Sequence, residues 1–267
     1  MVVSERMQNI AGELATVWAG HPTTILSEVD STNHWLKNRF FEHGSRHGAA
    51  VWADAQTAGR GRLGRQWESP PGLNIYTSLL LQPPKDRLSG ILSLVAGLAV
   101  VRATSLVTGL DARMKWPNDG IVSGRKFCGI LVEAGTEPNP WVVMGIGVNV
   151  RGATDPRYPD AVSLEQAAQR PLSREDIWVE LMGQLEWAYE SWLNNGNAWV
   201  AEQWAQKNVT LNQAVRVQRP GEDGWVGVAE RVDPDGGLWV RTGDRLEKII
   251  AGEVRLRLAD GRYASDN

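Results

Sequence analysis

Three arginines lie close together in the segment Gly-Arg-Gly-Arg-Leu-Gly-Arg-Gln-Trp, residues 59–67. Glycine lets backbone N–H groups come close to a ligand, and the guanidinium groups of Arg60, Arg62 and Arg65 can each pair with a phosphate or carboxylate through two hydrogen bonds. No acidic residue interrupts the segment before Glu68. The segment therefore predicts a loop that grips an anionic ligand and then covers it. A solvated loop or an RNA-binding arginine-glycine segment would have a similar composition.

Further short motifs on both sides of this segment combine polar, charged and glycine residues. They are Asp-Ser-Thr-Asn at 30–33, Gln56, Lys-Trp-Pro-Asn-Asp at 115–119, Lys-Phe-Cys-Gly-Ile-Leu-Val-Glu at 126–133 and Gly-Ile-Gly-Val-Asn at 145–149. The last motif lies in an apolar run that predicts a strand. Glycine inside a strand often marks a place where a ligand or another backbone comes close, although packing alone explains many such residues.

Composition limits the classes of protein to which the chain can belong. The 267 residues include 42% hydrophobic and 22% charged residues, which is typical of a globular protein with one large domain or two unequal ones. A net charge of −3 argues against a dedicated nucleic-acid-binding protein. No apolar run is long enough for a signal peptide or a membrane span, so we expect a cytoplasmic protein. The single cysteine, Cys128, excludes an intramolecular disulfide and a cysteine-rich zinc site.

The pattern of apolar residues predicts the elements that must position these motifs. Strands are expected at 24–29, 49–55, 73–81, 112–116, 120–122, 126–133 and 141–150. Four helices are expected: one that follows residues 30–33 and ends at about 41, one at 88–107, one that begins at a cap at Ser173, and one at about 198–207. From residue 208 the runs become short and β-like, at 214–218, 225–232, 238–241 and 247–250. We therefore predict a large domain at 1–207, a small β-barrel at 208–258 and a flexible tail at 259–267.

In their order and spacing, the motifs between Leu26 and Asn149 resemble those of the biotin protein ligase family, and the similarity continues more loosely to about Leu258. The resemblance implies an α+β catalytic domain with a mixed sheet and helices, related to class II aminoacyl-tRNA synthetases, followed by an SH3-like β-barrel. It implies an enzyme that joins biotin to ATP as biotinyl-5′-AMP and passes biotin to one lysine of a biotin carboxyl carrier protein.

This chemistry brings the carboxylate of biotin up to the α-phosphate of ATP. At ~4 Å and an effective dielectric constant of about 20, two such charges repel by about 4 kcal/mol, so cations must offset them. The resemblance implies Lys126 and Arg62 as catalytic cations, with Arg62 covering the intermediate, and we expect Asp119 to accept a proton from the incoming lysine. Mg²⁺ is implied because ATP carries more charge than these side chains can organise. We see no residues for an all-protein metal cage.

The same resemblance assigns the residues of two adjoining ligand sites. The biotin site is expected to contain Ser31, Thr32, Asn33, Gln56, Arg60, Gly61, Arg62, Trp67, Lys126 and Gly129. The ATP site is expected to contain Arg60, Arg62, Arg65, Asn118, Lys126 and Asn149. Each assignment has a structural alternative: Ser31 as a helix cap, Trp67 as a core residue, Lys126 as an exposed hairpin residue, and Asn118-Asp119 as an Asx turn.

The chain departs from the family pattern at several positions. Residue 63 is Leu where some members have a further basic residue, and the loop at 151–160 contains no tryptophan that could stack on adenine, which leaves Tyr158 as the candidate. Only about twenty residues precede the first predicted strand, so we expect no winged helix and no DNA binding. The resemblance leaves open whether the protein is a monomer or a homodimer, as many relatives are.

Two other functions compete with this interpretation. A lipoate or octanoyl transferase of the same fold would use a cysteine–lysine pair, and Cys128 is two residues from Lys126, which predicts that both lie on one strand face. A non-catalytic nucleotide- or RNA-binding protein would use the arginine-glycine segment alone. Its binding would depend steeply on salt and would release no pyrophosphate.

Overall fold

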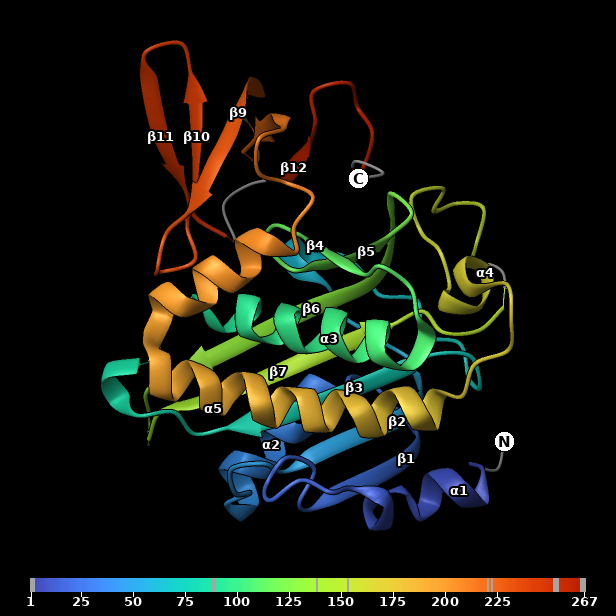
Figure 1. Ribbon diagram of the computed structural model, residues 1–267. Coiled ribbons are helices and arrows are strands. Elements are labelled where there is room, and N and C mark those ends of the chain that lie inside the picture. The colour runs from blue at the N-terminus through green and yellow to red at the C-terminus, as the bar shows by residue number, and fades with distance from the viewer. Residues whose placement is uncertain are drawn as a thin grey trace.

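The computed structural model describes residues 3–87, 90–137, 139–152, 154–219, 221, 223–251 and 255–264. A seven-stranded sheet has helices on both faces, and a separate five-stranded sheet lies at the C-terminal end (Figure 1). The helices are α1 (Glu5–Gln8), α2 (Thr32–His43), α3 (Leu92–Thr108), α4 (Leu164–Ala168) and α5 (Arg174–Gln206). Among the described residues, no helix is both long and apolar enough to cross a membrane.

The larger sheet has the spatial order β1-β2-β3-β7-β6-β5-β4. Its strands are β1 (Thr23–Val29), β2 (Ala50–Gln56), β3 (Ile75–Leu81), β4 (Arg113–Lys115), β5 (Asp119–Val122), β6 (Arg125–Gly135) and β7 (Trp141–Val148). β1 and β2 are parallel, whereas the other neighbouring pairs are antiparallel. The sheet is therefore mixed, as predicted, and each of its strands overlaps a predicted one.

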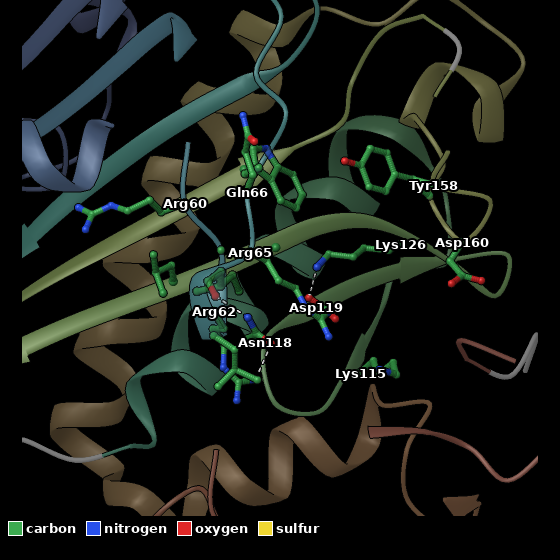
Figure 2. Close-up of a pocket in the computed structure, with 18 of the residues that line it drawn as sticks. Arg60, Arg62, Arg65, Gln66, Lys115, Asn118, Asp119, Lys126, Tyr158 and Asp160 are labelled. Atoms are coloured by element: carbon green, nitrogen blue, oxygen red, sulfur yellow. Dashed lines mark hydrogen bonds and ion pairs between the residues drawn. The ribbon is translucent and has the colours of Figure 1, made fainter. Parts of the chain in front are cut away.

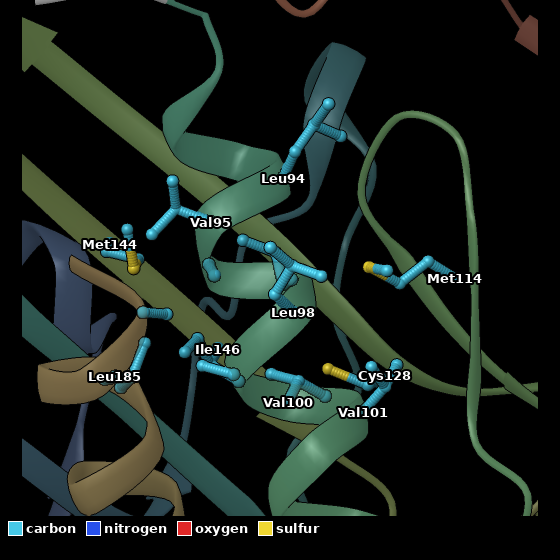
Figure 3. Close-up of a cluster of buried hydrophobic side chains, with 14 of the residues drawn as sticks. Leu94, Val95, Leu98, Val100, Val101, Met114, Cys128, Met144, Ile146 and Leu185 are labelled. Atoms are coloured by element: carbon cyan, nitrogen blue, oxygen red, sulfur yellow. The ribbon is translucent and has the colours of Figure 1, made fainter. Parts of the chain in front are cut away.

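Helices α3 and α5 cover one face of the sheet, and α2 covers the other (Figure 1). Along β2, Trp52 points into the core beneath α5, where it stacks on Trp178 with ring centroids 5.4 Å apart. The next residue toward the N-terminus, Val51, packs on the opposite face against Leu36 and Phe40 of α2. Figure 3 shows apolar side chains of α3, such as Val95 and Leu98, in a cluster with Met144 and Ile146 of β7 and Leu185 of α5. The two neighbours Trp52 and Val51 face opposite sides of the sheet, as the two-residue period of a strand predicts.

The helices follow the prediction with two differences, at the start of α3 and in two short helices. α3 begins at Leu92, and the first two residues of the predicted 88–107 helix lie outside the described residues. The element α5 contains both of the helices predicted here, because the backbone leaves the helical conformation at Gly196, where φ is 79°, and a second helix runs in a different direction from there to Gln206 (Figure 1). The helix resumes because Val200 and Trp204 continue the buried apolar face. The short helices α1 and α4 were not predicted, because four or five residues carry little periodic signal.

The C-terminal sheet is antiparallel and has the order β11-β10-β9-β8-β12. Its strands are β8 (Ala214–Gln218), β9 (Trp225–Val232), β10 (Leu238–Thr242), β11 (Arg245–Ile249) and β12 (Arg255–Leu258). The first four overlap predicted strands, while β12 was not predicted. The sheet agrees with the expected SH3-like domain; the boundary at residue 208 stays a prediction.

The C-terminal domain is fastened to the larger sheet beside β4. Trp116 donates a hydrogen bond from its indole nitrogen to the carbonyl of Gly236 at 2.9 Å, and Lys115 donates from Nζ to the carbonyl of Leu256 at 2.9 Å. Beyond β12, Ala264 is buried with Ile121 and the side chain of Tyr263 is partly buried. Residues 263 and 264 are therefore packed where the sequence predicts a flexible tail, because their side chains cover part of β5. Residues 265–267 lie outside the described residues.

Candidate active site

A cavity of about 720 Å³ opens on the α2 side of the larger sheet and extends to the C-terminal domain. Every residue that the sequence assigns to a ligand site lines this cavity. The alternation along β7 explains its position. Met144, Ile146 and Val148 belong to the core beneath α3 and α5, so Gly145 and Gly147 face the opposite side and leave space there.

One end of the cavity is a network of polar side chains around the start of α2. Gln56 accepts hydrogen bonds through Oε1 from the backbone N–H of Thr32 at 2.9 Å and from its hydroxyl at 3.2 Å. The hydroxyl of Ser78 lies 2.8 Å from Thr32 Oγ1 and 2.7 Å from Asn33 Oδ1. Ser31 is the N-cap residue of α2, yet its side chain makes no capping hydrogen bond. Ser31 lines the cavity, and its side chain is not used as the helix cap that the structural alternative predicts.

Asn33 is held in one orientation from both ends of its amide. Nδ2 donates to Glu133 Oε2 at 2.9 Å and to the carbonyl of Leu131 at 3.2 Å, while Oδ1 faces Ser78. Gly145 lies directly beneath this amide. A Cβ at residue 145 would lie 2.1 Å from Asn33 Oδ1, so only glycine leaves room for Asn33 there.

Trp67 forms a wall of the cavity and is not a core residue. Its ring lies over two glycines: a Cβ at Gly129 would be 2.8 Å from the ring, and one at Gly147 would be 2.6 Å from it. The ring centroid is 5.3 Å from Lys126 Nζ. The indole N–H is buried and has no hydrogen-bond partner among the described residues. An apolar surface with one unsatisfied donor suits a ligand that carries both an apolar chain and polar atoms.

Lys126 and Asp119 form an ion pair on the cavity wall, with Nζ 2.5 Å from Oδ1 (Figure 2). The side chain of Asp119 is only 9% exposed, whereas that of Lys126 is 24% exposed. Burial opposes ionisation of Asp119, but the charges of Lys126 and Lys115 outweigh it and hold the pKa of this carboxyl below its usual value. Lys126 is therefore not a solvated hairpin residue. It is a cation at the edge of a cavity.

The arginine segment folds over the cavity as a small hairpin, closed by a hydrogen bond from the Gly61 N–H to the Arg65 carbonyl at 2.7 Å. Arg62 reaches inward and donates from Nη1 to Asn118 Oδ1 at 3.1 Å, and burial lowers the pKa of its guanidinium. Asn118 is thus a partner of the arginine segment instead of only part of an Asx turn. Arg60 is directed away from Lys126 (Figure 2), and its Nη2 lies 3.7 Å from Glu133 Oε2.

The described residues contain no group of three or more His, Cys, Asp or Glu side chains that could hold a metal ion. The cavity wall carries the carboxylates of Glu68, Asp119 and Asp160 at separate places. The loop at 151–160 adds Tyr158, which lines the cavity and places its hydroxyl 3.4 Å from Glu68 Oε1. Whether this ring stacks on a base stays a prediction.

The chain also matches known proteins. Residues 26–149 match the Biotin/lipoate A/B protein ligase family, and residues 210–257 match the Biotin protein ligase C terminal domain. A biotin–[acetyl-CoA-carboxylase] ligase of Mycobacterium tuberculosis is 34% identical over 236 residues, which cover 86% of this chain and 87% of that protein. The chain belongs to the biotin protein ligase family.

Two further members of the biotin protein ligase family are similar to this chain, one in sequence and one in fold. The biotin–[acetyl-CoA-carboxylase] ligase of Paracoccus denitrificans is also 34% identical and covers 86% of this chain and 98% of its own. The solved structure of the biotin protein ligase from Aquifex aeolicus in complex with biotin and ATP has a TM-score of 0.77 at 29% identity, with 89% of this chain and 99% of that chain covered. The predicted family and fold class are thereby confirmed.

The single cysteine of this family member does not face the cavity. A register shift between β5 and β6 pairs Gly120 with Cys128 but Ile121 with Lys126, which leaves Phe127 as an extra residue. Lys126 therefore points to the cavity, while Cys128 is fully buried beside Val101 of α3 (Figure 3). The prediction that the two share a strand face is wrong, because the bulge interrupts the alternation. Burial also raises the pKa of the thiol, which disfavours the thiolate that an acyl-transferase would need.

Some residues that line the cavity near the C-terminal domain were not assigned from the sequence. Among them are Lys115, Arg257 and Tyr263, which carry a charge or a phenol. Lys115 is buried, and burial lowers its pKa to about 8. Its Nζ lies 4.1 Å from the centroid of the Tyr263 ring. The motif at 115–119 includes Lys115, but only the folded structure shows that strands from the C-terminal domain close over it.

Proposed function

We propose that this chain is an ATP-dependent biotin protein ligase. It forms biotinyl-5′-AMP from biotin and ATP and then transfers the biotinyl group to a lysine of a biotin carboxyl carrier domain of a carboxylase. The observation that carries this proposal is the Lys126–Asp119 ion pair, 2.5 Å long, on the wall of a cavity that the arginine segment covers. Family membership supports the choice of substrates.

The polar end of the cavity suits the ureido ring of biotin. The hydroxyls of Ser31 and Thr32 and the amides of Asn33 and Gln56 provide donors and acceptors in fixed orientations. The Trp67 ring and the glycines beneath it cover the apolar rings and chain, where each buried CH₂ group contributes about 0.8 kcal/mol. This orientation directs the carboxylate of biotin toward Lys126.

In the first step an oxygen of the biotin carboxylate bonds to the α-phosphorus of ATP, and pyrophosphate leaves with the electron pair of the broken P–O bond. Lys126 offsets the repulsion between the two anions, and Arg62 holds the phosphate from the covering segment. Mg²⁺ would be held mainly by the phosphate oxygens of ATP and by water, where it would neutralise phosphate charge, because the described residues offer no cluster of side chains for it. Closure of the arginine segment keeps water from the mixed anhydride.

In the second step the acceptor lysine must lose a proton before its amine attacks the biotinyl carbonyl. Asp119 is ionised and is placed to accept that proton. A C–N bond then forms, AMP leaves with the electrons of the C–O bond, and the second proton of the nitrogen passes to the departing phosphate. Asp119 Oδ1 pairs with Lys126. The two bound anions would draw Lys126 toward themselves and so free this oxygen for the proton.

The proposal is tested by incubating the protein with Mg-ATP and one of biotin, lipoate or octanoate, followed by mass spectrometry. We expect biotinyl-AMP with biotin only, and a mass gain on an added carrier domain. An acyl-AMP with lipoate or octanoate but none with biotin would reject the proposed function.

A cytoplasmic location belongs to the same proposal, because the reaction consumes ATP. The absence of DNA binding and the choice between monomer and homodimer stay predictions.

A further inference from the structure

The C-terminal segment reaches into the candidate active site through one side chain. The hydroxyl of Tyr263 donates a hydrogen bond to Oδ2 of Asp119, the oxygen that does not face Lys126. Residue 263 lies beyond the segments 26–149 and 210–257 that match the two family regions. One oxygen of Asp119 thus contacts Lys126 of β6, and the other accepts a hydrogen bond from the phenol of Tyr263.

Several contacts hold Tyr263 in this position. Its ring lies over two cations, 4.1 Å from Lys115 Nζ and 5.0 Å from Arg257 Cζ. The next residue, Ala264, is buried against Ile121 of β5. Lys115 in turn donates its hydrogen bond to Leu256 of β12. The phenol is therefore fixed by contacts to both domains, and the carboxylate that it binds cannot turn without breaking a hydrogen bond to a charged group.

We propose that Tyr263 is a positioning residue, which holds Asp119 so that Oδ1 points to the place where the acceptor amine must arrive. The inference rests on the proposed ligase function and concerns its second step. When Lys126 turns to the phosphate and carboxylate of the intermediate, Oδ1 loses its partner, whereas the bond from Tyr263 to Oδ2 keeps the carboxylate in place. One ammonium proton of the acceptor then passes to Oδ1, the C–N bond forms as the C–O bond to AMP breaks, and AMP leaves with the second proton on its phosphate.

The charged groups around Asp119 determine what a loss of the Tyr263 hydroxyl would do. Lys126 faces it from β6, Lys115 from β4 and Arg62 from the arginine segment. A hydrogen bond to the charged form of a carboxyl favours that form, so its removal raises the pKa of Asp119. The acid limb of a reaction that needs ionised Asp119 must then move to higher pH. A tyrosine that only packs against β5 would leave that limb unchanged.

The experiment compares wild type with Tyr263→Phe, which keeps the ring and removes the oxygen. Transfer is measured from chemically prepared biotinyl-AMP to a carrier domain across a range of pH, and adenylate formation is measured separately from biotin and Mg-ATP. We expect transfer to fall about ten- to a hundredfold, the effect of losing a hydrogen bond to a charged group, and to fall more than adenylate formation. We also expect the acid limb of transfer to move to higher pH.

Tyr189→Phe is the matched control, because Tyr189 packs against Trp18 and Trp192 and does not line the cavity. The Tyr189→Phe variant should transfer the biotinyl group to the carrier domain at the wild-type rate. A double-mutant cycle with Asp119→Asn adds a second measurement: Tyr263→Phe should have little further effect once Asp119 is neutral. Equal losses in both half-reactions, an unmoved acid limb or additive effects in the cycle would overturn the role of Tyr263 alone. A wild-type protein that makes no biotinyl-AMP would instead reject the proposed function, and this inference with it.

Discussion

Gly145 and Asn33 depend on each other, because a Cβ at residue 145 would lie 2.1 Å from the side-chain oxygen of Asn33. Real side chains do not approach so closely, so any other residue at 145 must push the amide out of its place. Asn33 lies at the polar end of the cavity and is oriented there by Glu133, Leu131 and Ser78. The shape of the proposed biotin site therefore depends on a glycine, without a Cβ atom, at position 145 of β7.

We predict that Gly145→Ala raises the KM for biotin about tenfold or more and raises that for ATP much less, because a displaced amide loses its hydrogen bonds to the ligand. Asn33→Ala should act in the same direction. Steady-state kinetics with each substrate varied in turn measure both values. Gly183→Ala is the control, since a Cβ at that position in α5 meets nothing within 4 Å. Equal increases for biotin and ATP in Gly145→Ala would show that Asn33 does not belong to the biotin site.

A second prediction concerns the thiol. Cys128 is fully buried and burial raises its pKa, so alkylating reagents at pH 8 should leave it unmodified in the folded protein and modify it in denaturant. Mass spectrometry of the intact protein measures the modification. Cys128→Ala should keep adenylate formation and lose about 1–3 kcal/mol of stability through the space left in the core. Rapid alkylation that abolishes activity would instead support an acyl-thioester route.

A third prediction concerns a buried ion pair outside the cavity. Arg174, at the start of α5, lies 2.8 Å from Asp54 of β2, and both side chains are less than 10% exposed. Asp54→Ala leaves a buried, unpaired guanidinium and should lower the free energy of unfolding by about 3–5 kcal/mol. Urea denaturation measures this change. Asp111→Ala breaks only surface pairs, with Arg113 and Lys207, and should cost no more than about 1 kcal/mol. Similar losses in the two variants would contradict the role assigned to the buried pair.

Local patterns in the sequence predict much of this fold and site. The short β-like runs at 214–218 and 225–232 predict β8 and β9. The family resemblance of the short motifs around Ser31, Arg62 and Lys126 assigns these residues to ligand sites, and the structure brings them together in one cavity. Each of these patterns lies within a few neighbouring residues, so it can be recognised in the sequence without knowledge of the tertiary structure.

What the sequence does not predict depends on contacts between distant segments. The extra residue Phe127 in β6 sends Cys128 into the core, and only the register with β5 creates this bulge. Tyr263 follows a glycine-containing turn in a polar C-terminal stretch, and nothing nearby indicates that it reaches Asp119, which is far away in the chain.

The proposed role of Lys126 is tested most directly by pyrophosphate exchange. We measure biotin-dependent exchange of pyrophosphate into ATP for wild type, for Lys126→Met and for the exposed surface control Lys207→Met, and we check by thermal unfolding that all three are folded. Loss of a preorganised cation at the reacting phosphate should lower exchange about 100- to 1,000-fold in Lys126→Met and leave Lys207→Met at the wild-type rate. Exchange at the wild-type rate in folded Lys126→Met would contradict the account.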